Sequence, residues 1–175
     1  GYEGTSVRDV ARSAHVSLSL LLYHFQSKDN LWRAVVEDLH ERISLPNLLQ
    51  EGSVDQSATE QLKLAIRAMV KTFSDIPQLH RLMTHEAHQP SERLIWMCES
   101  FIKEDFNALC ALIVKGQQEG TVNEFNPAQL RFAMVAIAAV PFAVSGEYQY
   151  LTKKNPFNAA EQESTIEILN RLVFK

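Results

Sequence analysis

The sequence predicts an all-α protein, and three observations lead to that fold class. Apolar residues recur at intervals of three and four along most of the chain, which is the period of helices with one buried face. Alternation of apolar and polar residues, the pattern of strands, is almost absent. Prolines and cap-type residues divide the chain into helix-length segments. With 175 residues, 46 % of them hydrophobic, the chain can bury a substantial core in one domain or in a small domain plus a larger one.

The first two expected helices are short and close together. Thr5 and Ser6 are N-cap residue types, and Ser17 is a second cap a few residues later. The inward faces after these caps consist of Val7, Val10, Ala11 and Ala14 in the first helix and of Leu21 and Phe25 in the second. Two short helices joined by a tight turn, with the small Ala11 at their crossing, form the helix-turn-helix pattern.

Longer helices follow. Ser27 caps a helix with Asp29 in its first turn, an apolar stripe at Leu31, Val35, Leu39 and Ile43, and Pro46 at its end. A polar stretch at 50–57 precedes a helix marked by Leu62, Ile66, Met69 and Phe73 and a shorter one over 76–87. We expect further helices over 91–118 and 127–150, the latter bent at Pro141, and a last helix after Asn155-Pro156.

The DNA-binding region of the TetR (tetracycline-repressor-like) regulators closely resembles about the first 40 residues, above all the runs GYEGTSVRDVARSAHVS and YHFQSKDNL. The resemblance implies a DNA-binding domain over 1–45 and a helical-bundle ligand-binding and dimerisation domain over 46–175. It places the recognition helix at 17–24, in the major groove, with Tyr23, His24 and Lys28 against phosphates. The full implied DNA-binding set is Thr5, Ser6, Ser17, Leu18, Ser19, Leu20, Tyr23, His24 and Lys28. The family has a helix before Gly-Tyr-Glu-Gly, and we expect this sequence to lack it.

The recognition region departs from the family pattern at three places. His15 stands where the family usually has Gly, so we expect a strained turn in the left-handed conformation. Leu18 and Ser19 stand where a Lys or Arg and a small residue are common, and Leu22 replaces a Tyr. Leucines cannot hydrogen-bond to base edges, although they could contact thymine methyl groups. The alternative is a degenerate helix-turn-helix that serves only as packing in a helical sensor or interaction protein.

The overall charge indicates that any binding to nucleic acid depends on a local positive surface. The net charge of −4 argues against indiscriminate binding to nucleic acid. Residues 1–30 are net neutral, with Arg8, Arg12 and Lys28 against Glu3, Asp9 and Asp29. A phosphate-binding surface normally needs a positive excess. In the family, the preceding segment is typically basic and supplies it.

The expected helix over 127–150 is apolar nearly all round, so it must be covered on all sides. The last helix has one apolar face, and such faces from two chains would form a four-helix interface, as they do in the family. A two-fold homodimer also suits a palindromic operator. The alternative is an internal core in a monomer. The candidate dimerisation residues are Phe132, Ile137, Val140, Val144, Ile166, Leu169, Leu172 and Val173.

Two carboxylates, Glu86 and Asp105, fall on inward helix faces among Leu, Met and Phe. Each could be locked by an arginine, for which Arg67, Arg81 and Arg131 are candidates, because an unpaired buried charge is costly. Each could instead be a polar anchor in an apolar pocket. In that case we expect an apolar effector with a cationic or hydrogen-bond-donating group. The ligand-binding set is then Met69, Phe73, Met83, Glu86, Met97, Phe101, Asp105 and Phe106.

The sequence contains few other residues in patterns typical of catalysis, cofactor binding or metal binding. The chain has no nucleophile elbow, no phosphate-cradling glycine loop and no Cys-X-X-Cys, so we expect neither an enzyme nor a cofactor. His80, His85 and His88 with Glu86 lack a second ligand pair of metal-binding spacing, so no metal is expected.

Cysteine spacing and apolar run lengths favour a cytoplasmic protein. Cys98 and Cys110, roughly 18 Å apart on one expected helix, cannot form a disulfide. That arrangement fits a reducing compartment. The apolar run over 132–144 is too short to span a bilayer. With the resemblance, the sequence points to a ligand-released, homodimeric repressor.

Overall fold

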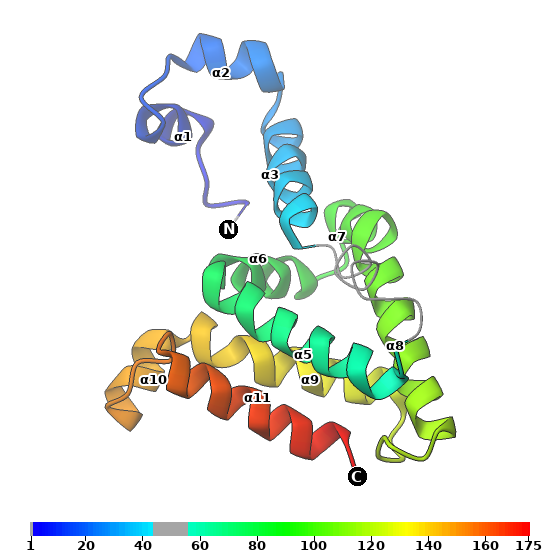
Figure 1. Ribbon diagram of the computed structural model, residues 1–175. Helices are drawn as coiled ribbons and strands as arrows, with labels where there is room; N and C mark the ends of the chain where they lie inside the picture. The colour runs from blue at the N-terminus through cyan, green and yellow to red at the C-terminus, as the bar shows by residue number, and fades with distance from the viewer. Residues whose placement is uncertain (1, 44–55) are drawn as a thin grey trace.

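A small head of three helices stands on a larger helical bundle (Figure 1). The computed structural model describes residues 2–43 and 56–175. The head contains α1 (Val7–Ser13), α2 (Leu18–Phe25) and α3 (Lys28–Ile43). The bundle contains α5 (Ala58–Asp75), α6 (Pro77–Ala87), α7 (Glu92–Met97), the π-helical turn η1 (Cys98–Ile102), α8 (Lys103–Gln118), α9 (Pro127–Ala143), α10 (Ser145–Thr152) and α11 (Ala159–Val173). No strand occurs within the described ranges, so the all-α fold class is confirmed.

The head has the expected helix-turn-helix geometry. Ser17 caps α2, since its hydroxyl accepts a hydrogen bond from the Leu20 N–H at 3.1 Å. The Ala11 and Leu21 side chains are buried where α1 and α2 cross. His15 has a φ of +56°, as expected for the residue in the glycine position of the turn. Ser6 occupies the N-cap position of α1, but its side chain makes no capping hydrogen bond.

The third helix joins the head to the bundle, and its buried face differs from the expected one. The Ser27 hydroxyl caps α3 by accepting from the Asn30 N–H at 3.1 Å. Trp32 and Val36 are the buried side chains of the described part of α3, and Val35, expected in the stripe, is exposed. The fully buried positions are therefore one residue later than the predicted stripe, and Met97 of the bundle packs against them. Leu39 of the stripe is half-buried against the bundle core. The expected domain border at 45/46 and Pro46 lie outside the described residues.

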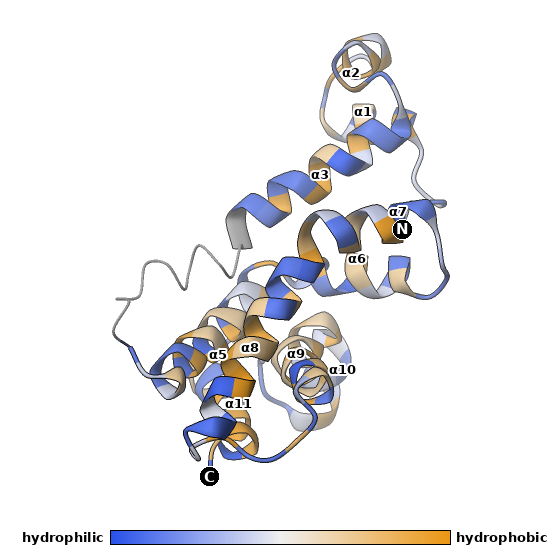
Figure 2. Cartoon of the chain, turned by 90° about the vertical axis from the view of Figure 1, so that its right-hand side faces the viewer, coloured by the Kyte–Doolittle hydropathy of each residue, from blue (hydrophilic) through white to orange (hydrophobic). Residues whose placement is uncertain are grey.

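Helix α5 is the centre of the bundle. It packs against α6, α8, α9 and α11, and hydrophobic segments concentrate where these helices meet (Figure 2). The N-terminus of α5 is closed by a capping box between Ser57 and Glu60. The largest fully buried side chains include Leu62, Ile66, Leu109, Ile113, Met134, Phe142 and Leu169. The bundle is thus a single continuous core, with the head attached at one end.

The apolar helix expected over 127–150 is two helices. Asn126 caps α9 by accepting from the Ala128 and Gln129 N–H groups, and Pro127 takes the first helical position. The helix continues through Pro141 and breaks at Val144, where α10 turns away by 77°. The bend is therefore three residues later than predicted. No single helix in the described ranges is long and apolar enough to cross a bilayer; only this bent pair meets the length and composition together.

The long helix expected over 91–118 is continuous but not uniform. It runs from α7 through the π turn η1 into α8. A π turn holds one residue more than an α turn, which rephases the side chains that follow it. Met97, Phe101, Asp105 and Leu109, spaced by four, consequently all line two adjoining cavities. In a uniform α-helix that spacing would rotate by about 40° at each step.

Candidate DNA-binding surface and ligand pocket

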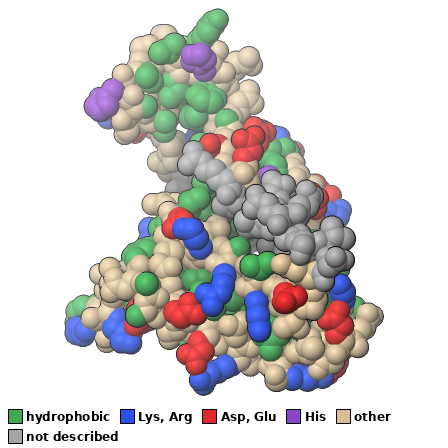
Figure 3. Space-filling model, viewed as in Figure 1, with side chains coloured by type: hydrophobic (Ala, Val, Ile, Leu, Met, Phe, Trp, Pro, Cys, Tyr) green, Lys and Arg blue, Asp and Glu red, His purple; other side chains and the backbone are tan. Residues whose placement is uncertain are grey.

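The recognition helix α2 presents an apolar and aromatic outer face. Tyr23 is 80 % exposed, Leu20 45 % and Leu22 38 %, and the Ser19 and His24 side chains are also exposed. Apolar and His side chains gather at the tip of the head (Figure 3). The helix packs on α1 and α3. Exposed apolar side chains of this kind suit thymine methyl groups in a major groove.

Two residues of the implied DNA-binding set are placed differently from the rest. Leu18 is half-buried, so it mainly supports the helix. Lys28 is also half-buried, with its Nζ 4.3 Å from the centre of the Tyr2 ring. Thr5, Ser6 and Ser17 are exposed, the first two at the start of α1 and Ser17 at the start of α2. The DNA contacts of the whole set remain predictions.

Positive charge in the head is scarce. Arg12 forms an ion pair with Asp9 at 2.8 Å, which neutralises one of the three basic side chains counted in the sequence. Asp29 accepts a hydrogen bond from the Tyr2 hydroxyl at 2.6 Å, and that bond, with burial and the charge of Asp29, raises the pKa of Tyr2. Within residues 2–30, Arg8 and Lys28 are therefore the basic groups left to face phosphates.

The head meets the bundle around Arg93, and we call Tyr2, Glu3, Glu86 and Arg93 the junction. The guanidinium carbon of Arg93 lies 3.8 Å from the centre of the Tyr2 ring. Its Nε donates to Glu86 at 3.1 Å, and an Nη donates to Glu3 at 3.3 Å. Burial alone would lower the pKa of Arg93, but the hydrogen bond and charge of Glu86 outweigh it and raise that pKa. One side chain of α7 thus binds both the head and α6.

Glu86 belongs to this junction and does not line the apolar cavities of the bundle. Its side chain is buried, and its partner is Arg93, seven residues later on the next helix. The arginines proposed from the sequence are engaged elsewhere or unpaired: Arg67 binds Glu163 through two hydrogen bonds, and Arg81 donates to the Ala143 carbonyl. The assignment of Glu86 to the ligand-binding set is therefore corrected, and the structural-lock alternative describes it.

Two further members of the predicted ligand set lie where α3 meets the bundle. Met97 packs with Trp32 and Val36, and Phe101 lies beside Trp96 and His40. Both line a cavity of about 60 Å³ under α3. Any change in this cavity would reach α3 directly, because Val36 and Leu39 form its other wall.

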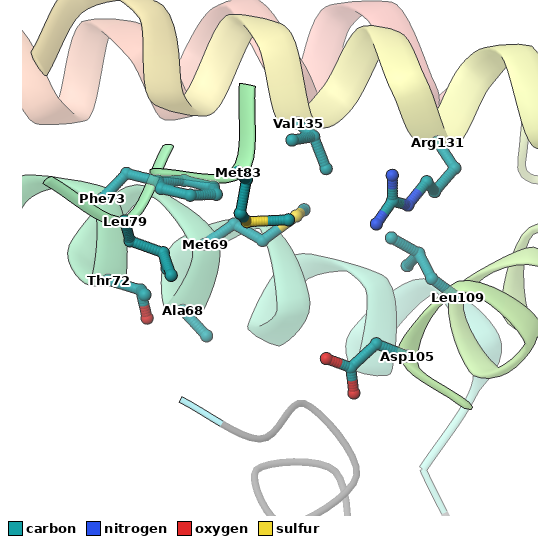
Figure 4. Close-up of a pocket in the computed structure, with 10 residues that line it drawn as sticks. All are labelled: Ala68, Met69, Thr72, Phe73, Leu79, Met83, Asp105, Leu109, Arg131 and Val135. Carbon is teal, nitrogen blue, oxygen red and sulfur yellow. The ribbon is translucent and has the colours of Figure 1, made fainter. Parts of the chain in front are cut away.

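A larger apolar pocket lies within the bundle (Figure 4). Its volume is about 100 Å³, and side chains from α5, α6, α8 and α9 line it: Ala68, Met69, Thr72, Phe73, Leu79, Met83, Asp105, Leu109, Arg131 and Val135. Four of the predicted ligand residues, Met69, Phe73, Met83 and Asp105, are brought together here. Phe106 is not; it lies beside Arg131 and Phe132, outside the lining. Leu79, Met83 and Asp105 also line the smaller cavity and so separate the two.

Arg131 is the polar group that the sequence did not assign to the pocket. It is 9 % exposed, and burial lowers its pKa, an effect that the nearby Cys110, Asp105 and Cys98 offset in part. Among the described residues its guanidinium forms no hydrogen bond and no ion pair; it lies 5.5 Å and 5.1 Å from the ring centres of Phe106 and Phe132. The available signal was an arginine at the start of an otherwise apolar helix.

The candidate dimerisation residues divide into two groups. Ile166, Leu169 and Val173 belong to the core of the single chain, and Leu169 is 0 % exposed. They are covered by their own chain and cannot form a surface for a second one, which corrects that part of the prediction. Ile137 and Leu172 are half-buried against the same core.

The remaining candidates are uncovered. Phe132 is 62 % exposed, and Ala136, Val140 and Val144 are also exposed at steps of four, so α9 and its C-cap residue carry an apolar outer stripe. Ile168 on α11 is exposed as well. Sequence reasoning missed Ile168 because it lies alone on the polar side of its helix.

The histidines of α6 do not converge. His80 packs edge-on against Phe73, and burial lowers its pKa. His85 lies 3.8 Å from Glu86, while His88 contacts the Thr84 carbonyl. In the described part of the chain, no group of three or more His, Cys, Asp or Glu side chains could hold a metal ion.

Comparison with known proteins agrees with this geometry. Residues 1–35 match the family described as bacterial regulatory proteins, tetR family. The HTH-type transcriptional regulator RutR of Escherichia coli strain K12 is 28 % identical over 136 residues, which are 78 % of this chain and 63 % of RutR. The probable HTH-type transcriptional regulator YttP of Bacillus subtilis strain 168 is 24 % identical over 120 residues, or 68 % of this chain and 58 % of YttP. The chain thus spans about three fifths of the length of these relatives.

Solved structures share the fold over the whole chain. A HlyIIR mutant protein superimposes with a TM-score of 0.76 at 21 % identity, covering 99 % of this chain and 87 % of that one. AibR, solved in complex with isovaleryl coenzyme A and operator DNA, gives 0.75 at 18 % identity, covering 99 % and 89 %. At these identities the likeness concerns the fold. The match at residues 1–35 and this shared fold make the chain similar to the tetR family of bacterial regulatory proteins.

Proposed function

We propose that this protein is a cytoplasmic, homodimeric transcriptional regulator, a repressor that leaves its operator when a small molecule enters the bundle. The observation that carries the proposal is the recognition helix α2, which is capped and packed as in a helix-turn-helix while its outer face stays exposed. A helix kept only for packing would be expected to bury that face. Operator-bound AibR has the same fold and supports the inference by analogy.

Ligand response is supported by the position of the pocket relative to the head. Asp105 and Leu109 line the pocket, and Arg93 binds Tyr2 and Glu3 of the head from the same continuous rod of helix. A ligand that favoured one position of this rod would bias the angle of the head through the junction and through α3. We propose that the ligand-free protein represses and that ligand binding, through this coupling, releases it from its operator.

A dimer is supported by the uncovered stripe of Phe132, Ala136, Val140 and Val144 on α9. Paired with its copy and with α11 of both chains, it would bury the apolar surface that one chain leaves in water. Phe132→Glu should give monomers that keep their helical content, because the residue is exposed in the single chain. Sedimentation velocity at micromolar concentration measures this. The control is Leu169→Glu, which should unfold the chain instead, and a wild type of single-chain mass would refute the dimer.

The DNA-binding proposal is tested by gel shift against the protein's own promoter region over a range of salt concentrations. Lys28→Ala should weaken specific and random DNA alike and flatten the logarithmic salt slope by about one unit, because one phosphate contact is lost. Tyr23→Ala should also weaken binding. Lys103→Ala is the matched control, since Lys103 is an exposed lysine of α8, paired with Glu99. An unchanged slope in folded Lys28→Ala would remove Lys28 from the interface.

The second candidate is a helical sensor that does not bind DNA. Scarce positive charge favours it, since Arg12 is already paired with Asp9 in the described head. The same gel shift separates the two functions. Binding that is absent at low salt for every promoter fragment, in folded protein, would favour the sensor.

A further inference from the structure

We propose that Arg131 is the anchor for the anionic group of the effector, and that the effector is a small apolar monocarboxylate. This inference rests on the proposed function in one respect, namely that the pocket of the bundle holds an effector. It reverses the cationic ligand expected from Asp105 and Glu86 alone. Three observations support it: the unused donors of Arg131, the apolar walls of its pocket, and the negative charge of Asp105 in the same pocket.

Arg131 is a cation whose donors are unused. A guanidinium has five N–H donors, and a buried one is normally paired or fully hydrogen-bonded. Arg131 is more than nine-tenths buried, yet among the described residues it has neither a hydrogen bond nor an ion pair. The rings of Phe106 and Phe132 supply only a weak attraction at more than 5 Å. A carboxylate fits the two-pronged guanidinium edge and would satisfy several donors at once.

Arg131 is also aimed into the pocket. In Figure 4 its side chain runs from α9 toward the space between Met83 and Leu109, and its guanidinium is one of the few polar groups among the lining residues. The remaining walls are mostly apolar and include Met69, Phe73 and Leu79. A ligand with its carboxylate at Arg131 would therefore place a hydrocarbon body against methionine, leucine and phenylalanine. The volume of about 100 Å³ suits a small molecule better than a drug-sized one.

Asp105 limits the charge of that ligand. It lines the same pocket from α8, and its charge favours the protonated form of Arg131. A single carboxylate beside Arg131 can keep its distance from Asp105, whereas a dicarboxylate would bring a second negative charge toward it. We therefore expect monocarboxylates to bind better than dicarboxylates of similar length.

The test is calorimetric titration of the DNA-free protein with matched probes. The first set is 4-methylpentanoate, its amide and the corresponding primary amine, followed by straight, branched and phenyl monocarboxylates of about four to eight carbons. The acid should bind, and the amide and amine should bind on the order of tenfold to hundredfold more weakly, because they cannot satisfy a cation. Equal binding of acid and amide, preferred binding of the amine, or no binding across the whole set would overturn the proposal.

Variants assign the effect to Arg131. Arg131→Gln should lose the preference for acid over amide, Arg131→Lys should keep part of it, and Arg67→Gln should keep all of it, because Arg67 pairs with Glu163 on the surface. Circular dichroism and thermal melts confirm that each variant is folded. Should Arg131→Gln not fold, the contrast between acid and amide in wild type and Arg131→Lys still decides. Because no DNA is present, failure here leaves the gel shift unaffected, and a failed gel shift leaves carboxylate binding to be judged by itself.

Discussion

The junction contains a half-buried arginine and the pocket a buried one, and the two differ in their partners and in the direction of their pKa shifts. Arg93 binds two carboxylates and an aromatic ring, and its pKa is raised. Arg131 has no such partner among the described residues, and burial lowers its pKa. In the first arrangement the guanidinium is paired within the protein, although the Oε1 atom of Glu86 accepts no hydrogen bond. In the second the guanidinium has no ion-pair partner in the described chain, and an anion could supply one; this difference separates a structural lock from a candidate binding site.

The largest effect on stability should come from breaking the ion pair between Arg93 and Glu86. Arg93→Met leaves the Glu86 carboxylate buried without its cation, and we expect the free energy of unfolding to fall by about 3 kcal/mol. Urea denaturation measures it. Lys103→Ala, which breaks an exposed pair with Glu99, should change stability by no more than about 0.5 kcal/mol and serves as the control. A loss for Arg93→Met as small as that of the control would mean that Glu86 is satisfied in another way.

A smaller effect should come from the aromatic part of the junction. Tyr2→Leu removes the ring that Arg93 and Lys28 approach, and we expect the head to be held less firmly by about 1 kcal/mol. Hydrogen exchange of amides in α1 to α3 is the suitable readout, with amides in α5 as an internal reference. Tyr2→Phe keeps the ring and loses only the hydrogen bond to Asp29, so its exchange should lie near that of the wild type. If both variants loosen the head equally, the ring is not the contact that matters.

The smallest effect on stability should come from the pocket. The folded pKa of Arg131 lies below its unfolded value, so the protonated group opposes folding at every pH where it is charged. Arg131→Met should therefore leave the free energy of unfolding within about 1 kcal/mol of the wild type, or raise it. Denaturation beside Arg93→Met gives the comparison directly. A fall of several kcal/mol in the free energy of unfolding would mean that Arg131 stabilises the fold as Arg93 does, against this prediction.

Local signals in the sequence were sufficient to predict the structure of the head. The caps at Ser17 and Ser27, the small Ala11 at the crossing and the left-handed conformation of His15 all depend on residues within a few positions of one another. Periodicity also identified Glu86 and Asp105 as inward-facing carboxylates. Periodicity could not identify their environment, because the partner of Glu86 lies on the next helix, beyond Pro90, and Arg131 reaches the pocket from α9.

Other features had no signal in the sequence. An apolar face has the same pattern whether its own chain or a second one covers it, so Leu169 in the core and Phe132 on the surface were given the same role. Proline marks a weakened hydrogen bond but not the residue at which the chain turns, which is Val144 rather than Pro141. The fully buried positions of α3 lie one residue later than the predicted stripe, and their partner, Met97, could not be known in advance.

The π turn at Cys98–Ile102 sets the rotation of the α8 side chains relative to those of α7 along one continuous rod of helix. At one end Arg93 engages the head, and at the other Asp105 faces the pocket. Removing the extra residue that this π turn holds would restore a uniform α-helix and leave the two ends nearly in phase, because five residues of a π turn cover about the angle that four cover in an α-helix. A deletion in an α-helical part of the rod would instead rotate one end against the other by about 100°. The π turn is therefore a place where the chain can lose one residue while Arg93 and Asp105 keep their present relation.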